Sequence, residues 1–117
     1  MRYMLLICSE GHEEATQPAD GDDDRDPTDW VDEMDRRGIR SMGERLAAPE
    51  DATTVRVRDG QLLLTDGPFI ESKELVAGFD IIDCADLDEA IEVASKHPMA
   101  RFGMIEVRPF WTPPPRS

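Results

Sequence analysis

The stretch that decides the fold lies at residues 53–69 and reads TTVRVRDGQLLLTDGPF. Two strand-like runs, 53–58 and 61–65, flank Asp59-Gly60, and an Asp-Gly connection of two residues is the strongest short-range signal for a β-hairpin. The sequence Asp66-Gly67-Pro68 then breaks the chain, because glycine tolerates left-handed dihedrals and proline fixes its own φ. Phe69 follows at once. The stretch therefore predicts a hairpin that ends in a rigid corner, where binding residues tend to collect.

Before the hairpin, the chain predicts a strand, a helix and a second strand. The continuous apolar run at 3–8 is typical of a strand that is covered on both faces. Asp26-Pro27 indicates an N-cap followed by proline at the first helical position. The helix presents an apolar face and ends at Gly38, and a short strand follows at 39–46. The residues expected on the apolar face are Trp30, Val31 and Met34.

After the corner, the chain predicts a strand, a helix and a last strand. The strand at 75–83 is again apolar at adjacent positions. Asp86 is expected to cap the second helix, with Glu89 in capping-box spacing, and Pro98 is expected to stop it. The last strand is expected at 102–107. The chain then ends in a tail from Phe110 onward, proline-rich over 111–117, that can pack through its aromatic side chains. The apolar helix positions are Leu87, Ala90, Ile91 and Ala94.

This order of elements predicts one domain over residues 1–117, of the α+β class. It is a split βαβ, ferredoxin-like arrangement with an inserted β-hairpin. Two helices can cover only one face of an antiparallel sheet, yet the strands at 3–8 and 75–83 are apolar on both faces. A second copy of the chain is the simplest cover for the other face, so we expect a homodimer.

Composition excludes several classes of function. The formal net charge is −13, from 26 acidic and 13 basic residues, and such a surface repels phosphate backbones, which excludes direct nucleic-acid binding. No apolar run approaches the roughly 20 residues that span a bilayer, and the start of the chain is too short for a signal peptide. We therefore expect a cytoplasmic protein without membrane contact. Cys8 and Cys84 are expected to be buried free thiols.

The segment at 11–26 is expected to be an acidic, mobile loop, because its like charges repel one another. Its Asp20-x-Asp22-x-Asp24 spacing resembles the start of a calcium-binding EF-hand loop. That interpretation fails, since Arg25 stands where the loop needs glycine and Val31 where it needs glutamate. No metal site and no cofactor is predicted.

Several ordered motifs together resemble the DGPF-domain branch of the YCII-related proteins. The resemblance runs from about residue 38 to residue 110 and implies a ferredoxin-like, dimeric α/β-barrel. Most members have no established activity. In the better-known YCII proteins a histidine in the first helix and an Asp-Pro after the second have been proposed as an acid–base pair. Here His97-Pro98 stands at the Asp-Pro position and the first helix has no histidine, so that pair is not intact. The motifs are Thr54-Val55-Arg56, Asp59-Gly60, Asp66-Gly67-Pro68-Phe69, Gly78-Phe79, Asp86-Leu87-Asp88-Glu89-Ala90, Gly103 and Glu106-Val107-Arg108-Pro109.

The corner after the hairpin carries the main candidate ligand-binding residues. In one interpretation Asp66-Gly67 is only a turn and Phe69 only plugs the sheet. In the other, charged side chains rim a cleft with Phe69 as its apolar wall, which is how small polar ligands are held. The charged residues of this candidate site are Asp66, Glu71, Lys73 and Glu74.

Two further positions have a structural and a functional interpretation. Arg108 lies two residues from Glu106 on one strand face. The two either form an ion pair or leave Arg108 to bind a carboxylate or phosphate through its guanidinium fork. His97 ends the second helix, where the partial negative charge of the helix C-terminus favours a histidine, so a structural role is its simpler explanation. Asp66 and His97 are weak catalytic candidates, and His12 is expected to be solvated.

Two functions stay open at this point. One is a small-molecule-binding or enzymatic α/β-barrel that works as a homodimer. The other is a regulatory or interaction module, because DGPF-type proteins resemble domains associated with extracytoplasmic-function sigma factors. An acidic domain can dock on a basic transcription factor without touching DNA. An enclosed cleft at the Asp66 corner would favour the first function, and a filled corner with an exposed apolar patch the second.

Overall fold

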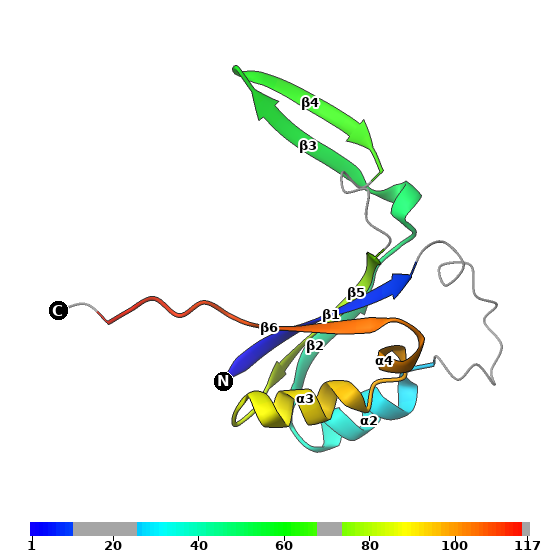
Figure 1. Ribbon diagram of the computed structural model, residues 1–117, viewed down its shortest axis with the longest axis vertical. Coiled ribbons are helices and arrows are strands. Elements are labelled where there is room, and N and C mark those ends of the chain that lie inside the picture. The colour runs from blue at the N-terminus through cyan, green and yellow to red at the C-terminus, as the bar shows by residue number, and fades with distance from the viewer. Residues whose placement is uncertain (11–25, 68–73, 116–117) are drawn as a thin grey trace.

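Four antiparallel strands form the central sheet of the protein, whose computed structural model describes residues 1–10, 26–67 and 74–115 (Figure 1). The strands are β1 (Arg2–Glu10), β2 (Arg40–Arg45), β5 (Glu74–Asp83) and β6 (Met104–Pro109), in the order β2-β5-β1-β6. Strand β5 thus separates β1 from β2, and β1 separates β5 from β6, which is a doubly split βαβ arrangement. The predicted α+β class is confirmed, and the topology is consistent with a ferredoxin-like fold.

Two main helices, α2 (Thr28–Arg36) and α3 (Leu87–Ser95), lie on the same face of this sheet (Figure 1). Alternate residues of the central strand β1 point at them, because successive side chains of a strand face opposite ways. The core therefore lies between the helices and one sheet face. It consists of Tyr3, Leu5, Ile7, Trp30, Met34, Ile39, Ile82, Cys84, Ala90, Val93 and Ala94. Both cysteines are free and buried, as predicted.

Local capping chemistry sets the helix ends. Asp86 accepts a hydrogen bond of 2.9 Å from the Glu89 backbone N–H, and the Glu89 side chain reaches back to the Ala85 N–H at 2.7 Å. The predicted cap of α3 is confirmed. Gly38 ends the first helix with a φ of 70°, also as predicted. Asp26 accepts from the Thr28 N–H at 2.9 Å, but α2 begins at Thr28 and Pro27 occupies the cap position, one residue later than predicted.

Two predictions around the second helix were wrong. Leu87 and Ile91 are about half exposed, because α3 turns its face with Ala90, Val93 and Ala94 toward the sheet. The last strand also does not begin at residue 102 as predicted. A short helix, α4 (Met99–Phe102), comes first, and the last strand begins at Met104.

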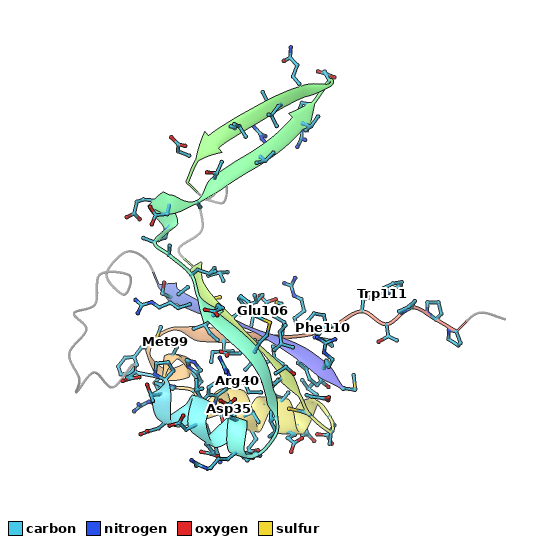
Figure 2. All side chains as sticks on the ribbon, turned by 180° about the vertical axis from the view of Figure 1, so that it is seen from behind. Asp35, Arg40, Met99, Glu106, Phe110 and Trp111 are labelled. Carbon is cyan, nitrogen blue, oxygen red and sulfur yellow. The ribbon has the colours of Figure 1, made fainter. Side chains whose placement is uncertain are left out.

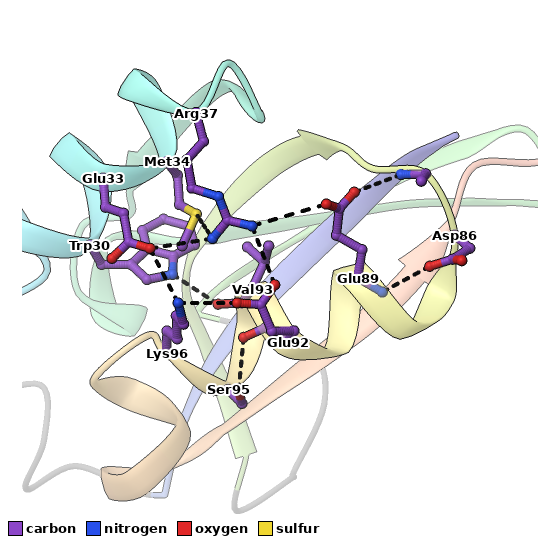
Figure 3. Close-up of polar contacts among 11 residues, drawn as sticks. Trp30, Glu33, Met34, Arg37, Asp86, Glu89, Glu92, Val93, Ser95 and Lys96 are labelled. Carbon is purple, nitrogen blue, oxygen red and sulfur yellow. Dashed lines mark hydrogen bonds and ion pairs between the residues drawn. The ribbon is translucent and has the colours of Figure 1, made fainter.

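Charged side chains join the outer surfaces of α2 and α3 (Figure 3). Arg37 lies 3.3 Å from Glu33 and 3.3 Å from Glu92, and Lys96 lies 3.3 Å from Glu33 and 3.1 Å from Glu92. These pairs are largely exposed, so each adds little to stability. Beneath them, the Trp30 indole N–H donates to the Val93 carbonyl at 2.9 Å. This buried hydrogen bond ties the two helices together.

The hairpin forms a separate two-stranded sheet of β3 (Thr53–Arg58) and β4 (Gln61–Asp66), preceded by a 3₁₀ turn at Pro49–Asp51. Asp59 and Gly60 both have positive φ, 53° and 76°, as a two-residue hairpin turn requires. The predicted hairpin is confirmed. Figure 1 shows it extending away from the four-stranded sheet.

The edges and the tail of the sheet are irregular. The pairing of β2 with β5 shifts register between Arg40 and Met42. After β6, Phe110 stacks under the Arg2 guanidinium at 5.0 Å, but Trp111 is 80% exposed, so the predicted packing of the tail holds only for its first aromatic residue. Within the described ranges, no helix is long and apolar enough to cross a membrane. The predicted acidic loop lies outside the described residues, except for Asp26.

Candidate functional site

The residues predicted for the corner site are only partly described. Phe69, Glu71 and Lys73 lie outside the described residues. Asp66 ends β4, is exposed and stands opposite Thr53 at the base of the hairpin.

Gly67 closes the base of the hairpin. It has a φ of 88°, its N–H donates to the Ala52 carbonyl at 2.7 Å, and its carbonyl accepts from the Thr54 hydroxyl at 2.8 Å. Asp66-Gly67 is therefore a turn with a structural task, whatever else the corner does. The described candidates are not brought together, because Asp66 belongs to the hairpin sheet and Arg108 to the edge of the main sheet.

His97 lies buried at the end of α3, with 4% of its surface exposed. The Met99 backbone N–H donates to its Nδ1 at 3.0 Å, so the neutral ring carries its proton on Nε2. Burial lowers the pKa of His97 to about 4. The cost of removing a charged imidazole from water therefore exceeds the attraction that the helix end offers it.

The His97 ring packs against the side chain of Trp30 in α2. The two ring centres are 4.7 Å apart in an edge-to-face arrangement. His97 thus meets the first helix through the aromatic ring of Trp30. This contact fixes the imidazole orientation and supports the structural interpretation of His97.

A buried ion pair that the sequence analysis missed lies on the helix-covered face of the sheet. Arg40 Nε donates to Asp80 Oδ1 at 2.9 Å, and Arg40 also lies 3.6 Å from Asp35 of α2 (Figure 2). Burial raises the pKa of the Asp80 carboxyl, and the hydrogen bond from Arg40 opposes that rise. Burial lowers the pKa of Arg40, but the Asp80 and Asp35 carboxylates outweigh it and raise the pKa. Arg40 therefore stays charged and neutralises the buried carboxylate.

Gly43 makes room for this pair. It stands opposite Asp80 in the ladder between β2 and β5, and a Cβ added there would overlap the Asp80 carboxylate. The signal in the sequence was Asp80 itself, since it shares a strand face with Gly78 and the core residue Ile82. A carboxylate at a core-facing position of an apolar strand requires a buried partner.

The sheet face opposite the helices is apolar at its centre and charged at its margin. Met4 stands opposite Ile81, and Leu6 stands opposite Phe79. All four side chains are half-buried by their neighbours in the sheet. On the neighbouring edge strand β6, Arg108 flanks Met4 and Glu106 flanks Leu6.

Arg108 and Glu106 form an ion pair on this margin, and a ligand-binding role of Arg108 stays a prediction. Both side chains are at least 46% exposed, so the pair is accessible from solvent and weakly held. Figure 2 shows Glu106 and Phe110 along this part of the sheet. The arrangement places a guanidinium fork next to an apolar surface.

Comparisons with known proteins identify the family of the chain. The family model described as the YCII-related domain matches residues 1–112. An uncharacterized protein of Rhizobium meliloti (strain 1021) is 36% identical over 97 residues, which is 68% of this chain and 78% of that protein. The family model covers all elements from β1 through β6 of the structure described above. The chain therefore belongs to the YCII-related family.

Proposed function

We propose that the chain is a homodimeric, ferredoxin-like α/β-barrel of the DGPF-domain branch that binds a small polar ligand. The observation that carries the proposal is the open sheet face, which combines an apolar centre with an accessible arginine at its margin. A face of this kind is typical of a surface that another molecule covers.

The apolar centre supports the homodimer. Met4, Leu6, Phe79 and Ile81 lie on the two middle strands, and Met42 on β2 continues the patch with 46% of its surface exposed. No described helix lies on this side of the sheet (Figure 1). Two copies related by a two-fold axis would bury the same patch on each other, so that one surface serves both partners.

Arg108 supports a ligand with a carboxylate or phosphate group. Its side chain is 67% exposed, and among the described residues its ion-pair partner is Glu106, two residues away on the same strand. An incoming oxyanion can take the place of Glu106 and gain two parallel hydrogen bonds from the fork. The neighbouring apolar side chains would then contact the rest of the ligand.

Two experiments test the proposal separately. For the dimer, the double variant Leu6→Thr/Ile81→Thr should raise the dissociation constant at least tenfold in sedimentation equilibrium. Ile91→Thr, on the exposed side of α3, should leave the constant unchanged. A wild-type protein that sediments as a monomer of about 13 kDa at micromolar concentration, in low and high salt, would refute the dimer.

For the ligand, a panel of short carboxylates and phosphate esters is screened by thermal shift. Arg108→Gln should abolish any shift found with the wild type, while Glu106→Gln should preserve or enlarge it because a competing carboxylate is gone. Arg36→Gln, an exposed arginine of α2, is the matched control. Equal shifts for wild type and Arg108→Gln would rule out Arg108 as the binding residue.

A second candidate function is an interaction module for an extracytoplasmic-function sigma factor. The exposed apolar side chains of the hairpin favour it, since a docking domain needs such a patch. Titration with a purified sigma factor of this class tests it. An acidic domain bound to a basic partner should lose affinity steeply as salt rises, and absence of binding at low salt would exclude this function for the factor tested.

A further inference from the structure

The hairpin of β3 and β4 has one face that is entirely apolar along its middle. Val55 stands opposite Leu64, and Val57 stands opposite Leu62. Directly opposite residues share a face of an antiparallel pair. The four side chains are 59%, 62%, 58% and 64% exposed, in that order. The other face carries Arg56, Arg58 and Leu63 among polar residues, so the two faces differ in chemistry.

A two-stranded sheet of this kind is at best marginally stable in water by itself. In the described part of the chain, no third strand pairs with β3 or β4. The hairpin nevertheless has a well-formed turn and a base closed by Gly67, which binds both Ala52 and Thr54. An ordered arm whose apolar face stays exposed among the described residues is typical of a surface that another molecule covers.

We propose that the hairpin is an exchange arm whose apolar face packs on a second copy of this chain. The inference rests on the proposed homodimer and adds a second contact region to it. In a two-fold assembly each copy gives one arm and receives one, so the same contact forms twice. The arm would lie against its partner on the side of Val55, Val57, Leu62 and Leu64.

The distribution of charge favours this partner. Between Thr53 and Asp66 the hairpin has two arginines, Arg56 and Arg58, and two acids, Asp59 and Asp66, so the whole net charge of −13 lies outside it. Arg56 and Arg58 lie on the opposite face, so the face that packs is uncharged along its middle. It can approach the acidic surface of another copy of this chain without repulsion between like charges.

The area needed for a stable dimer points the same way. Four aliphatic side chains alone fall short of the roughly 800 Å² per partner that standard interfaces bury. The open sheet face of Met4, Leu6, Phe79 and Ile81 supplies a second apolar region on the same chain. The apolar face of the hairpin and the open sheet face are both exposed to solvent in a single chain. Formation of one dimer would bury both.

The test compares the two faces of the hairpin. Leu62→Thr/Leu64→Thr removes two leucines from the apolar face and replaces them with a residue that favours strands. Leu63→Thr makes the matched change on the opposite face. We expect sedimentation equilibrium to give a dissociation constant at least tenfold higher for the double variant and less than twofold higher for the control. Equal constants for the double variant and the wild type would overturn the inference.

The result also separates this inference from the proposed dimer. If Leu6→Thr/Ile81→Thr weakens the dimer and Leu62→Thr/Leu64→Thr does not, the dimer stands and the exchange arm is wrong. If the wild type is monomeric at all concentrations, both are wrong.

If the double variant does not fold, hydrogen exchange of the hairpin amides in the wild-type protein tests the inference instead. Protection of β3 and β4 that rises with protein concentration supports the arm. Rapid exchange at every concentration overturns it, whichever other partner the protein has.

Discussion

Arg40 Nε lies 2.9 Å from Asp80 Oδ1 on the helix-covered face of the sheet, where the two side chains are 18% and 10% exposed. Desolvation makes such a pair costly to form and more costly to break, because a lone partner leaves an unpaired buried charge. The pair therefore determines how the edge strand β2 is anchored beneath α2.

Breaking this pair from one side should destabilise the fold strongly. Arg40→Met is expected to lower the free energy of unfolding by about 3–5 kcal/mol, because Asp80 is left without its cation. The double variant Arg40→Met/Asp80→Leu should recover most of this loss. Urea denaturation of the four proteins gives the coupling energy. Strict additivity of the two single variants would show that the residues do not depend on each other.

A side chain at Gly43 should displace the Asp80 carboxylate. Gly43→Ala is expected to cost about 1–3 kcal/mol, which is typical of overpacking, since the new Cβ would overlap that carboxylate. In an Asp80→Ala background the same substitution should cost clearly less. Thermal or urea unfolding measures both costs. A Gly43→Ala cost that is the same in the two backgrounds would mean that the carboxylate is not the obstacle.

The buried imidazole of His97 predicts a loss of stability in mild acid. Its pKa falls from 6.5 to about 4 on folding. Between pH 6.5 and pH 4, the imidazole of His97 is therefore protonated in the unfolded chain and neutral in the folded chain. The contribution of the neutral His97 to the free energy of unfolding is complete above about pH 6.5. It is lost as the pH falls toward 4, and the total loss is about 3 kcal/mol. The measurement is the free energy of unfolding as a function of pH.

The matched variant for this prediction is His97→Asn. Its amide oxygen can accept the Met99 N–H in place of Nδ1 and does not titrate. The difference between wild type and variant should therefore shrink or change sign between pH 7 and pH 4, while the carboxylates titrate in both. Parallel stability curves for the two proteins would contradict a depressed pKa.

The capping box of α3 gives a local prediction. Asp86→Ala should cost about 1 kcal/mol, because the Glu89 N–H loses its acceptor. Asp88→Ala, in the first turn of the same helix, is the control and should cost less than half as much. Urea denaturation distinguishes them. Equal losses would assign the effect to the charge near the helix start rather than to the cap.

Sequence reasoning worked where the determining chemistry is local. Asp59-Gly60 fixes the hairpin turn through two positive φ angles, and Asp86 with Glu89 fixes the start of α3. It failed where the result depends on burial between distant segments. Arg40 and Asp80 are 40 residues apart, and the neutral state of His97 comes from its burial. These environments exist only once the helices lie on the sheet.

The candidate site was less predictable than the fold. Arg108 and Glu106 were correctly placed on one face, because the period of a strand is two. Neither position showed that this face is the one without helices, since that depends on the strand order. The corner residues Phe69, Glu71 and Lys73 lie outside the described residues, and their roles stay predictions.

The register shift in β2 has a consequence for how the protein avoids uncontrolled aggregation. An edge strand is a template for further pairing unless it is bent, charged or blocked. Strand β2 is bent between Arg40 and Met42 and carries Glu44 and Arg45, while β6 ends in Pro109, which has no N–H to donate. Both ends of the ladder are thus poor templates for growth into a fibril. Association through the sheet is thereby left to its broad face, where the proposed second copy would close the assembly and would not extend it.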